Sequence, residues 1–219
     1  LAKIDANMNA DANERQLQRG LVESVKHQPE LLTVAEMVVD GDGAGASAAL
    51  AEAPVEMRES AAALFAKGMA HYQQESWSEA IVALKKCVAR DPENSEAWFA
   101  LGYAYDAQNG GKSCEASFEP YTRCIALDPK HAVAHSNLGT VLKNVRKDYD
   151  GAEKMYRKAI ELDPKQTNAC WNLSAILERQ RSDIPGAIKA VEEYIRRGNP
   201  DNDGEQRLAR LRRKLERST

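Results

Sequence analysis

The sequence has only four cysteines, has almost no net charge, and lacks any long apolar run. A membrane-spanning helix needs about 18 or more nearly uninterrupted apolar residues, so none is expected here. The net charge of -3 argues against a dedicated nucleic-acid binder, because such proteins carry a strongly basic surface. We therefore expect neither a membrane span nor a nucleic-acid partner.

The cysteines do not form a disulfide framework. Cys114 and Cys124 are separated by nine residues, as in oxidised helical hairpins, but that motif needs a second such pair and the sequence has none. Reduced, packed thiols are the expectation, which places the chain in an intracellular compartment, either cytoplasmic or an organelle interior. The first residue is Leu rather than Met, so we expect a processed chain or a fragment, in which a targeting peptide would not be visible.

Motifs that carry chemistry are also missing. No glycine-rich phosphate loop, nucleophile elbow or Cys–His pairing occurs, so neither catalysis nor a cofactor is expected. His131 and His135 are four residues apart, but zinc would need further ligands nearby. The segments 5–9 and 40–42 begin like calcium loops, yet the twelfth position holds Gln16 in one and Ala51 in the other instead of the required Glu. No metal site is predicted.

A register of large and small residues recurs about every 34 positions. Its best copies begin at Trp98 and Leu138, and each copy from residue 61 onward ends in a proline, preceded by Asp in the first three. A period of this length indicates stacked helix pairs, in which a small residue on the leading helix lets the trailing helix approach closely. The small residues are Gly68, Gly102, Gly139 and Ser174 on the leading helices, with Ala80 and Ala152 on trailing ones.

The register divides the chain into three parts. Residues 61–202 hold four repeats, at 61–94, 95–131, 132–166 and 167–202, and the second repeat has about three extra residues around Gly110. Pro120 would interrupt the second trailing helix, so that helix should start late, near Glu119, after an excursion over 108–118. Residues 203–219 form a basic helix that caps the stack. An extra residue is expected near Tyr149 in the third repeat.

Residues 1–60 form an acidic, partly helical extension, with eleven Asp or Glu against five Lys or Arg. Leu17, Leu21 and Val25 indicate one amphipathic helix, and Pro29 can open a second that runs to about Val39. The glycines at 41–45 should break the helix, leaving a short one over 48–53.

The spacing Trp-x-x-Leu-Gly-x-x-Tyr, followed by a small residue, an aromatic residue, another small residue and Pro, resembles the tetratricopeptide repeat family from residue 61 to about 218. The resemblance implies an all-α, right-handed superhelical solenoid whose inner groove is lined by the leading helices. It also implies a non-catalytic scaffold for proteins.

Within that family, the segments around Asn137-Leu138-Gly139 and Trp171-Asn172-Leu173 are similar to the Asn-Leu repeats of O-GlcNAc transferase and kinesin light chains. In those relatives the asparagines form a ladder that binds the backbone of an extended peptide. The carboxylate clamp of chaperone-binding relatives is not expected, because Phe65 and Met69 occupy the places of its Lys and Asn. The resemblance therefore implies a peptide-binding groove that includes Phe99, Tyr103, Asn137, Thr140, Lys143, Trp171 and Asn172, in which Lys143 would favour an acidic ligand.

Three functions remain open from the sequence. The first is an adaptor that binds a peptide or helix of a partner protein in this groove. The second is a structural subunit of a multi-subunit complex that uses its convex face, the 108–118 excursion and its tails, with the groove empty or filled by the N-terminal segment. The third is the substrate-recruiting arm of an enzyme whose catalytic domain is absent.

Overall fold

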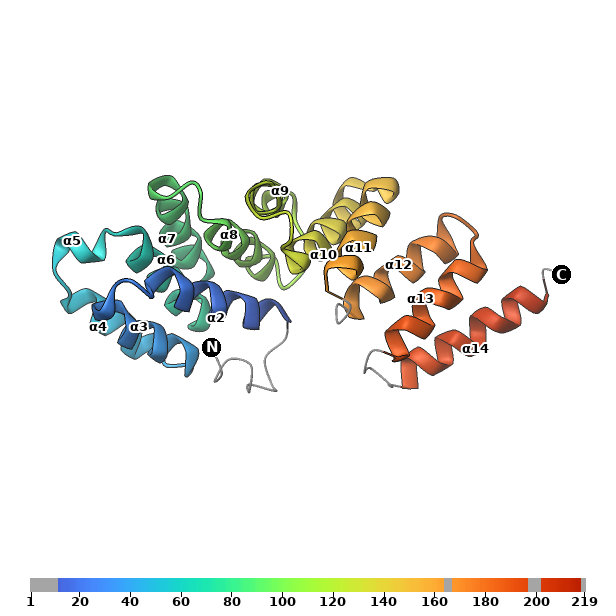
Figure 1. The fold of residues 1–219 in the computed structure, drawn as a ribbon, viewed down its shortest axis with the longest axis horizontal. Coiled ribbons are helices and arrows are strands. Elements are labelled where there is room, and N and C mark those ends of the chain that lie inside the picture. The colour runs from blue at the N-terminus through green and yellow to red at the C-terminus, as the bar shows by residue number, and fades with distance from the viewer. Residues whose placement is uncertain (1–11, 164–166, 197–201, 218–219) are drawn as a thin grey trace. The chain divides into compact units, whose positions relative to one another are not determined.

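The computed structural model describes residues 12–163, 167–196 and 202–217, and within these residues all regular structure is helical. The chain forms two compact units, residues 1–129 and 130–219 (Figure 1). The predicted all-α class, with a helical extension before the repeats and a helix after them, is confirmed. Among the described helices, none combines the length and apolar character needed to cross a bilayer.

The first unit contains the N-terminal extension and two helix pairs. The extension consists of α2 (Ala12–Val25), α3 (Pro29–Val39), α4 (Gly43–Glu52) and the single turn α5 (Val55–Arg58). The pairs are α6 (Ala61–Gln73) with α7 (Trp77–Arg90), and α8 (Ser95–Gln108) with α9 (Phe118–Leu127).

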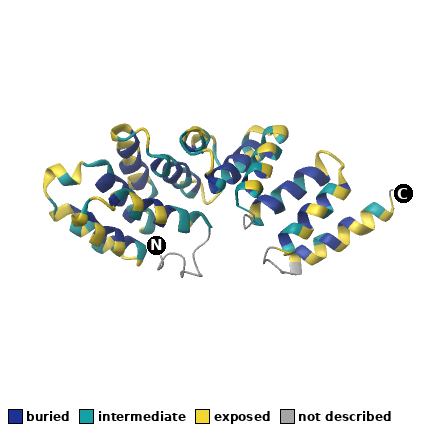
Figure 2. Cartoon of the chain, in the orientation of Figure 1, coloured by how far each residue is buried: buried dark blue, intermediate teal, exposed yellow. Residues whose placement is uncertain are grey.

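The second unit contains two further pairs and a final helix. These are α10 (Ala132–Val141), which continues into the π-helical turn η2 (Leu142–Arg146), with α11 (Tyr149–Leu162), then α12 (Thr167–Arg179) with α13 (Ile184–Arg196), and α14 (Asn202–Glu216). In Figure 2 the buried residues of the longer helices gather on the side that faces a neighbour, and α14 packs against α13.

Each of the first three helix pairs is closed by a glycine opposite a large side chain. A Cβ atom built on Gly102 would lie 2.8 Å from the Tyr121 ring, and one on Gly139 would lie 2.9 Å from the Tyr156 ring. Gly68 stands in the same relation to Leu84, at 2.7 Å. These distances are below contact, so the absence of a side chain is what allows the helices to pack this closely. The predicted role of the small residues is confirmed at these three positions.

The ends of the helices follow from local chemistry. Trailing helices α7 and α9 stop directly before Asp91-Pro92 and Asp128-Pro129, because proline cannot continue the backbone ladder. The turns between paired helices use left-handed residues, namely Glu75, Lys147 and Ser182, with Gly110 and Gly111 in the second pair. The predicted Gly198-Asn199-Pro200 stop and Pro164 lie outside the described residues.

The excursion of the second repeat is anchored rather than loose. After α8 the chain makes a 3-10 turn at Glu115–Ser117, and Pro120 is the third residue of α9, where its missing N–H costs nothing. Asp106 Oδ1 accepts a hydrogen bond from the backbone N–H of Cys114 at 3.1 Å. The helix starts at Phe118, one residue before the predicted Glu119.

One local prediction needs correction, and another coincides with an irregular turn. The break at 41–45 is shorter than predicted, because Asp42 accepts a hydrogen bond from Gly45 N at 2.7 Å and so caps α4, which already starts at Gly43. Only Gly41 is left-handed there, with φ +87. In the third repeat, the π-helical turn at Leu142–Arg146 disrupts the regular helix ahead of Tyr149, where the extra residue is expected.

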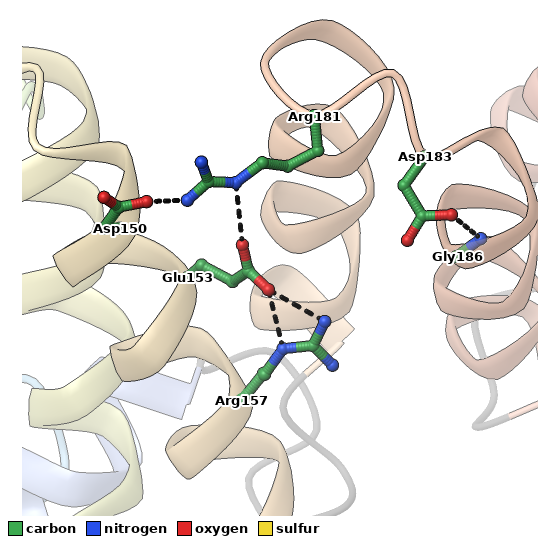
Figure 3. A network of polar contacts seen from close by, with 6 residues as sticks. All are labelled: Asp150, Glu153, Arg157, Arg181, Asp183 and Gly186. Atoms are coloured by element: carbon green, nitrogen blue, oxygen red, sulfur yellow. Dashed lines mark hydrogen bonds and ion pairs between the residues drawn. The ribbon is translucent and has the colours of Figure 1, made fainter.

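A polar network links the third repeat to the fourth within the second unit (Figure 3). Arg181, in the turn after α12, pairs with Asp150 and with Glu153 Oε2 at 3.3 Å, and Glu153 Oε1 pairs with Arg157 at 2.9 Å. Asp183 caps α13 by accepting from Gly186 N at 2.9 Å. The network holds the turn against α11.

Candidate peptide-binding face

The leading helices of the first unit are covered by the N-terminal extension. Helices α2, α3 and α4 all pack on α6, and α2 also packs on α8 (Figure 1). Gln16 Nε2 donates to Glu96 Oε1 at 2.6 Å, and a Cβ on Gly20 would lie 2.8 Å from Glu96 Cβ. Gln74 Nε2, at the end of α6, donates to the carbonyl oxygen of Gly43 at 2.8 Å. The extension is therefore fitted closely to these helices.

Of the two predicted aromatic groove residues of the first unit, one is buried and the other is partly accessible. Phe99 is completely buried between Tyr103, with ring centroids 6.2 Å apart, and Tyr121, at 6.0 Å. Tyr103 is only partly accessible and stacks on Tyr72 at 5.5 Å. Phe65 and Met69, at the places of the absent carboxylate clamp, are also buried. In this structure Phe99 is a core residue, so its prediction as a groove residue is wrong for this conformation.

The leading helices of the second unit keep their predicted residues partly accessible. Asn137 and Thr140 lie on α10, Lys143 lies in the π-helical turn, and Trp171 and Asn172 lie on α12. Two of them are joined directly, because Lys143 Nζ donates to Asn172 Oδ1 at 2.5 Å. Thr140 Oγ1 donates to the Ser136 carbonyl at 3.0 Å and accepts from the Tyr156 hydroxyl at 3.1 Å. Five of the seven predicted residues therefore lie on the leading helices of one unit.

The capping helix α14 adds residues that the sequence analysis did not assign to this face. The guanidinium of Arg207 lies 4.4 Å from the centroid of the Trp171 ring, a cation–π geometry. Arg210 Nη2 lies 2.7 Å from Glu178 Oε2, on α12. A signal for this was available, since Asn137, Asn172 and Arg207 follow one another at intervals of 35 residues. The capping helix therefore continues the row of the leading helices.

The electrostatics of this face are dominated by cations. Burial lowers the pKa of Lys143, and the nearby charges of Arg179 and Arg207 lower it further. Burial also lowers the pKa of Arg207, an effect that the carboxylate of Glu178 opposes. Burial raises the pKa of the Tyr156 hydroxyl, which serves as a hydrogen-bond donor. Lys143, Arg179 and Arg207 thus bring three positive charges close together on this face.

Neither the histidines nor the calcium-like segment show a metal-binding arrangement. His131 Nδ1 accepts from Ala134 N at 3.0 Å and so caps α10. Asp42 caps α4, and the segment 5–9 lies outside the described residues. Within the described ranges, no group of three or more His, Cys, Asp or Glu side chains could hold a metal ion.

The first unit also contains a cavity of about 560 Å³ between the α4–α5 region and the α6–α7 pair. Apolar residues such as Leu50, Leu64 and Val82 line it. Arg58, Lys67, Lys86, Glu59 and Glu79 also line it, so its wall carries charges of both signs.

Comparisons with known proteins identify the repeats. A family model named TPR repeat matches residues 68–109, and one named Tetratricopeptide repeat matches residues 137–203. No curated protein sequence matches the chain.

Several solved structures have a similar fold. A crystal structure of MamA has a TM-score of 0.66 and 24% sequence identity, and the match covers 76% of this chain and 95% of that one. YrrB, a TPR protein with an unusual peptide-binding site, has a TM-score of 0.67 and 16% identity over 87% of this chain and 97% of its own. TTC0263, a thermophilic TPR protein of Thermus thermophilus, has a TM-score of 0.58 and 18% identity, covering 84% of this chain and 97% of that one. The chain thus carries tetratricopeptide repeats in both units, on the helical fold that these structures share.

Proposed function

We propose that the protein is a non-catalytic interaction scaffold, and that the leading helices of its second unit bind an extended peptide segment of a partner protein. Stacked helical repeats present continuous surfaces that suit extended ligands. The observation that carries the proposal is the row of partly accessible polar residues Asn137, Asn172 and Arg207, one on each successive leading or capping helix.

The chemistry of the row suits a peptide backbone. An asparagine amide offers both a donor and an acceptor, so each can pair with one N–H and one carbonyl of an extended strand. Trp171 supplies apolar area beside Asn172, and its ring is held against Tyr194 with centroids 5.2 Å apart. YrrB, a TPR protein of similar fold, has a peptide-binding site, which supports a peptide-binding role for this chain.

The test is selection of peptides by the intact chain. We expect the wild-type protein to enrich members of a phage-displayed library of random dodecapeptides, and Asn137→Ala with Asn172→Ala to lose them. Gln180→Ala, which removes an exposed amide in the α12–α13 turn, is the matched control and should retain the peptides. The melting temperature of the double variant should stay within about 3 °C of the wild type, because both side chains are partly exposed. Equal retention by the double variant would contradict the proposal.

A structural role within a larger assembly is the second candidate. It is favoured by the first unit, whose leading helices are already covered by α2, α3 and α4 and whose excursion at 109–117 presents Gly110 and Gly111 with open space around them. If this is the function, the purified chain should aggregate without companion subunits, and peptide selection should yield nothing.

A further inference from the structure

Basic residues from three elements surround the second half of the proposed binding face. Lys143 comes from the π-helical turn, Arg179 from the end of α12, and Arg207, Arg210 and Lys214 from α14. The carboxylate paired with the residues of α14 is that of Glu178 on α12, which is buried. The carboxylate of Glu178 thus pairs with three cations of α14.

Glu178 is already engaged by α14. Its Oε2 lies 2.7 Å from Arg210 Nη2 and 3.6 Å from Arg207 Nη2, and its Oε1 lies 3.7 Å from Lys214 Nζ. Only the Arg210 contact has the length of a charge-assisted hydrogen bond. Glu178 therefore holds α14 in place and pairs with Arg207 by charge, but it does not accept a hydrogen bond from the Arg207 guanidinium.

Arg207 is the most constrained of these cations. Its side chain is only 10% exposed, and its Nε and Nη2 atoms are buried without a hydrogen-bond acceptor. The ring of Trp171 covers it at 4.4 Å. Buried guanidinium donors are nearly always paired in folded proteins, so unsatisfied ones point to a group that arrives from outside.

The hydrogen-bond partner of Lys143 does not balance its positive charge. Its ammonium donates to the amide oxygen of Asn172, which is neutral and cannot balance its charge. The two other charges that act on it, Arg179 and Arg207, are both positive. π-Helical turns are frequent at functional sites, and this one places Lys143 beside the asparagine row.

We infer that Lys143, Arg179 and Arg207 form a carboxylate-binding subsite, and that the partner segment presents an Asp or Glu side chain to it at the level between Asn172 and Arg207. This inference rests on the proposed function and names the chemistry of the ligand. The carboxylate of the partner replaces the Asn172 amide oxygen as the acceptor for the Lys143 ammonium. The Asn172 amide can then pair with the peptide backbone. The exposed guanidinium of Arg179 adds a second positive charge from the solvent side of the subsite. The constrained guanidinium of Arg207 adds a third.

The test compares two octapeptides with blocked ends, one alternating Glu and Ala and the other alternating Gln and Ala, by calorimetry with the full chain. We expect the Glu peptide to bind at least about tenfold more tightly than the Gln peptide, which is the scale of one well-formed charge pair. Lys143→Gln should abolish the difference. Lys154→Gln removes the same charge from an exposed site on α11 and should leave the difference unchanged.

A spectroscopic readout separates contact from folding. The NMR signals of Arg207 Nε–H and of the Trp171 indole N–H should shift on addition of the Glu peptide and not of the Gln peptide. Arg207→Lys, which keeps the charge but loses the planar fork, should weaken binding of the Glu peptide less than Arg207→Gln does. Should Arg207→Gln fail to fold, Lys143→Gln and the NMR shifts still decide the question.

Other outcomes overturn the inference in distinguishable ways. Equal binding of the two octapeptides, or library peptides that bind without any acidic residue, would remove the carboxylate subsite while leaving the proposed function intact. Complete displacement of the Glu peptide by about 10 mM inorganic phosphate at constant ionic strength would show a general anion site and also overturn it. If neither octapeptide nor any library peptide binds, the proposed function itself fails.

Discussion

The hydroxyl of Tyr121 donates a hydrogen bond to Asp106 Oδ2 at 2.9 Å, and both residues are buried. The same carboxylate receives the N–H of Cys114, so it joins the leading helix, the excursion and the trailing helix of the second repeat. Asp106→Ala would remove the acceptor of the Tyr121 hydroxyl and of the Cys114 N–H, and we expect a loss of about 1–3 kcal/mol in the free energy of unfolding for each donor that finds no water. Urea denaturation measures this loss in the free energy of unfolding. Tyr121→Phe, which removes only one donor, should cost less.

This aspartate also makes a pH-dependent contribution. Burial raises the pKa of Asp106, although hydrogen bonds from Ser117, Tyr121 and Cys114 act in the opposite direction. A carboxyl group whose pKa is raised by folding contributes stability below its unfolded pKa and loses that contribution as the pH rises through its folded pKa. Asp106→Asn does not titrate, so its cost in unfolding free energy should be larger at about pH 4 than at pH 7. An equal cost at the two pH values would contradict the assignment.

The contact between Gly139 and Tyr156 should make the glycine intolerant of any side chain. Gly139→Ala should destabilise the protein by about 1–3 kcal/mol through overpacking, more than alanine gains by helix propensity. The fourth repeat suggests a rescue, because it has Ser174 and Val191 at the corresponding places. In a Tyr156→Val background the alanine should therefore be tolerated. Additive costs in this double-mutant cycle would show that the two residues are not coupled.

Two of the interactions drawn in Figure 3, the helix cap of Asp183 and the ion pairs of Arg181, should contribute unequally to stability. Asp183→Ala removes the cap of α13 and should cost about 0.5–2 kcal/mol. Arg181→Ala should cost less than about 1 kcal/mol, because Arg181 is 39% and Asp150 72% exposed and water screens the pair. The cost of Arg181→Ala should shrink further in high salt, whereas that of Asp183→Ala should persist. Chemical denaturation with and without about 0.5 M NaCl checks both.

The close packing of α2 against Glu96 of α8 depends on the absence of a side chain at Gly20. Gly20→Leu should push α2 away from Glu96 on α8 and loosen the packing of the extension on the first unit. We expect trypsin to cut at Arg15 and Arg19 about tenfold faster or more, which corresponds to a loss of about 1.4 kcal/mol in local stability. Glu23→Leu places the same side chain at an exposed position of the same helix and should not change the cleavage rate.

The four thiols should differ in reactivity. Cys87, Cys124 and Cys170 are buried, and burial raises the pKa of Cys87 to about 12, with the charge of Asp91 adding to the effect. Cys114, in the excursion, is partly accessible. Because the thiolate is the reactive form, a maleimide at pH 7 should label Cys114 first in the native protein and all four in denaturant. Mass spectrometry of the labelled peptides identifies the site.

Much of the helical arrangement could be predicted from the sequence. Helix pairs, their glycines and their proline stops follow from residues that are close in sequence, and the 34-residue period repeats the information several times. The period does not encode local geometry. The cap at Asp42 starts α4 earlier than predicted, and the form that the helix takes near the expected extra residue, a π-helical turn before Lys147, was not predicted.

The binding face was harder to predict, for a different reason. Phe99 and Trp171 occupy the same place of the register, three residues before Gly102 and Ser174, yet one is fully buried and the other partly accessible. Phe99 packs on Tyr103 and Tyr121 in a unit where α2 also lies on α8, and nothing in the repeat pattern states where a segment 80 residues away in the chain will pack. Arg207 was visible in the spacing, but its contact with Trp171 exists only once α14 has folded.

What the sequence determined by itself is the type of building block: alternating bulky and small residues at a fixed interval allow only closely packed helical hairpins. What the tertiary structure decided is which surfaces of those hairpins stay available. Solvent exposure belongs to the assembled fold, since it depends on every segment that packs nearby, and so the covered face of residues 61–108 and the open, cationic face of residues 137–214 could be separated only in three dimensions.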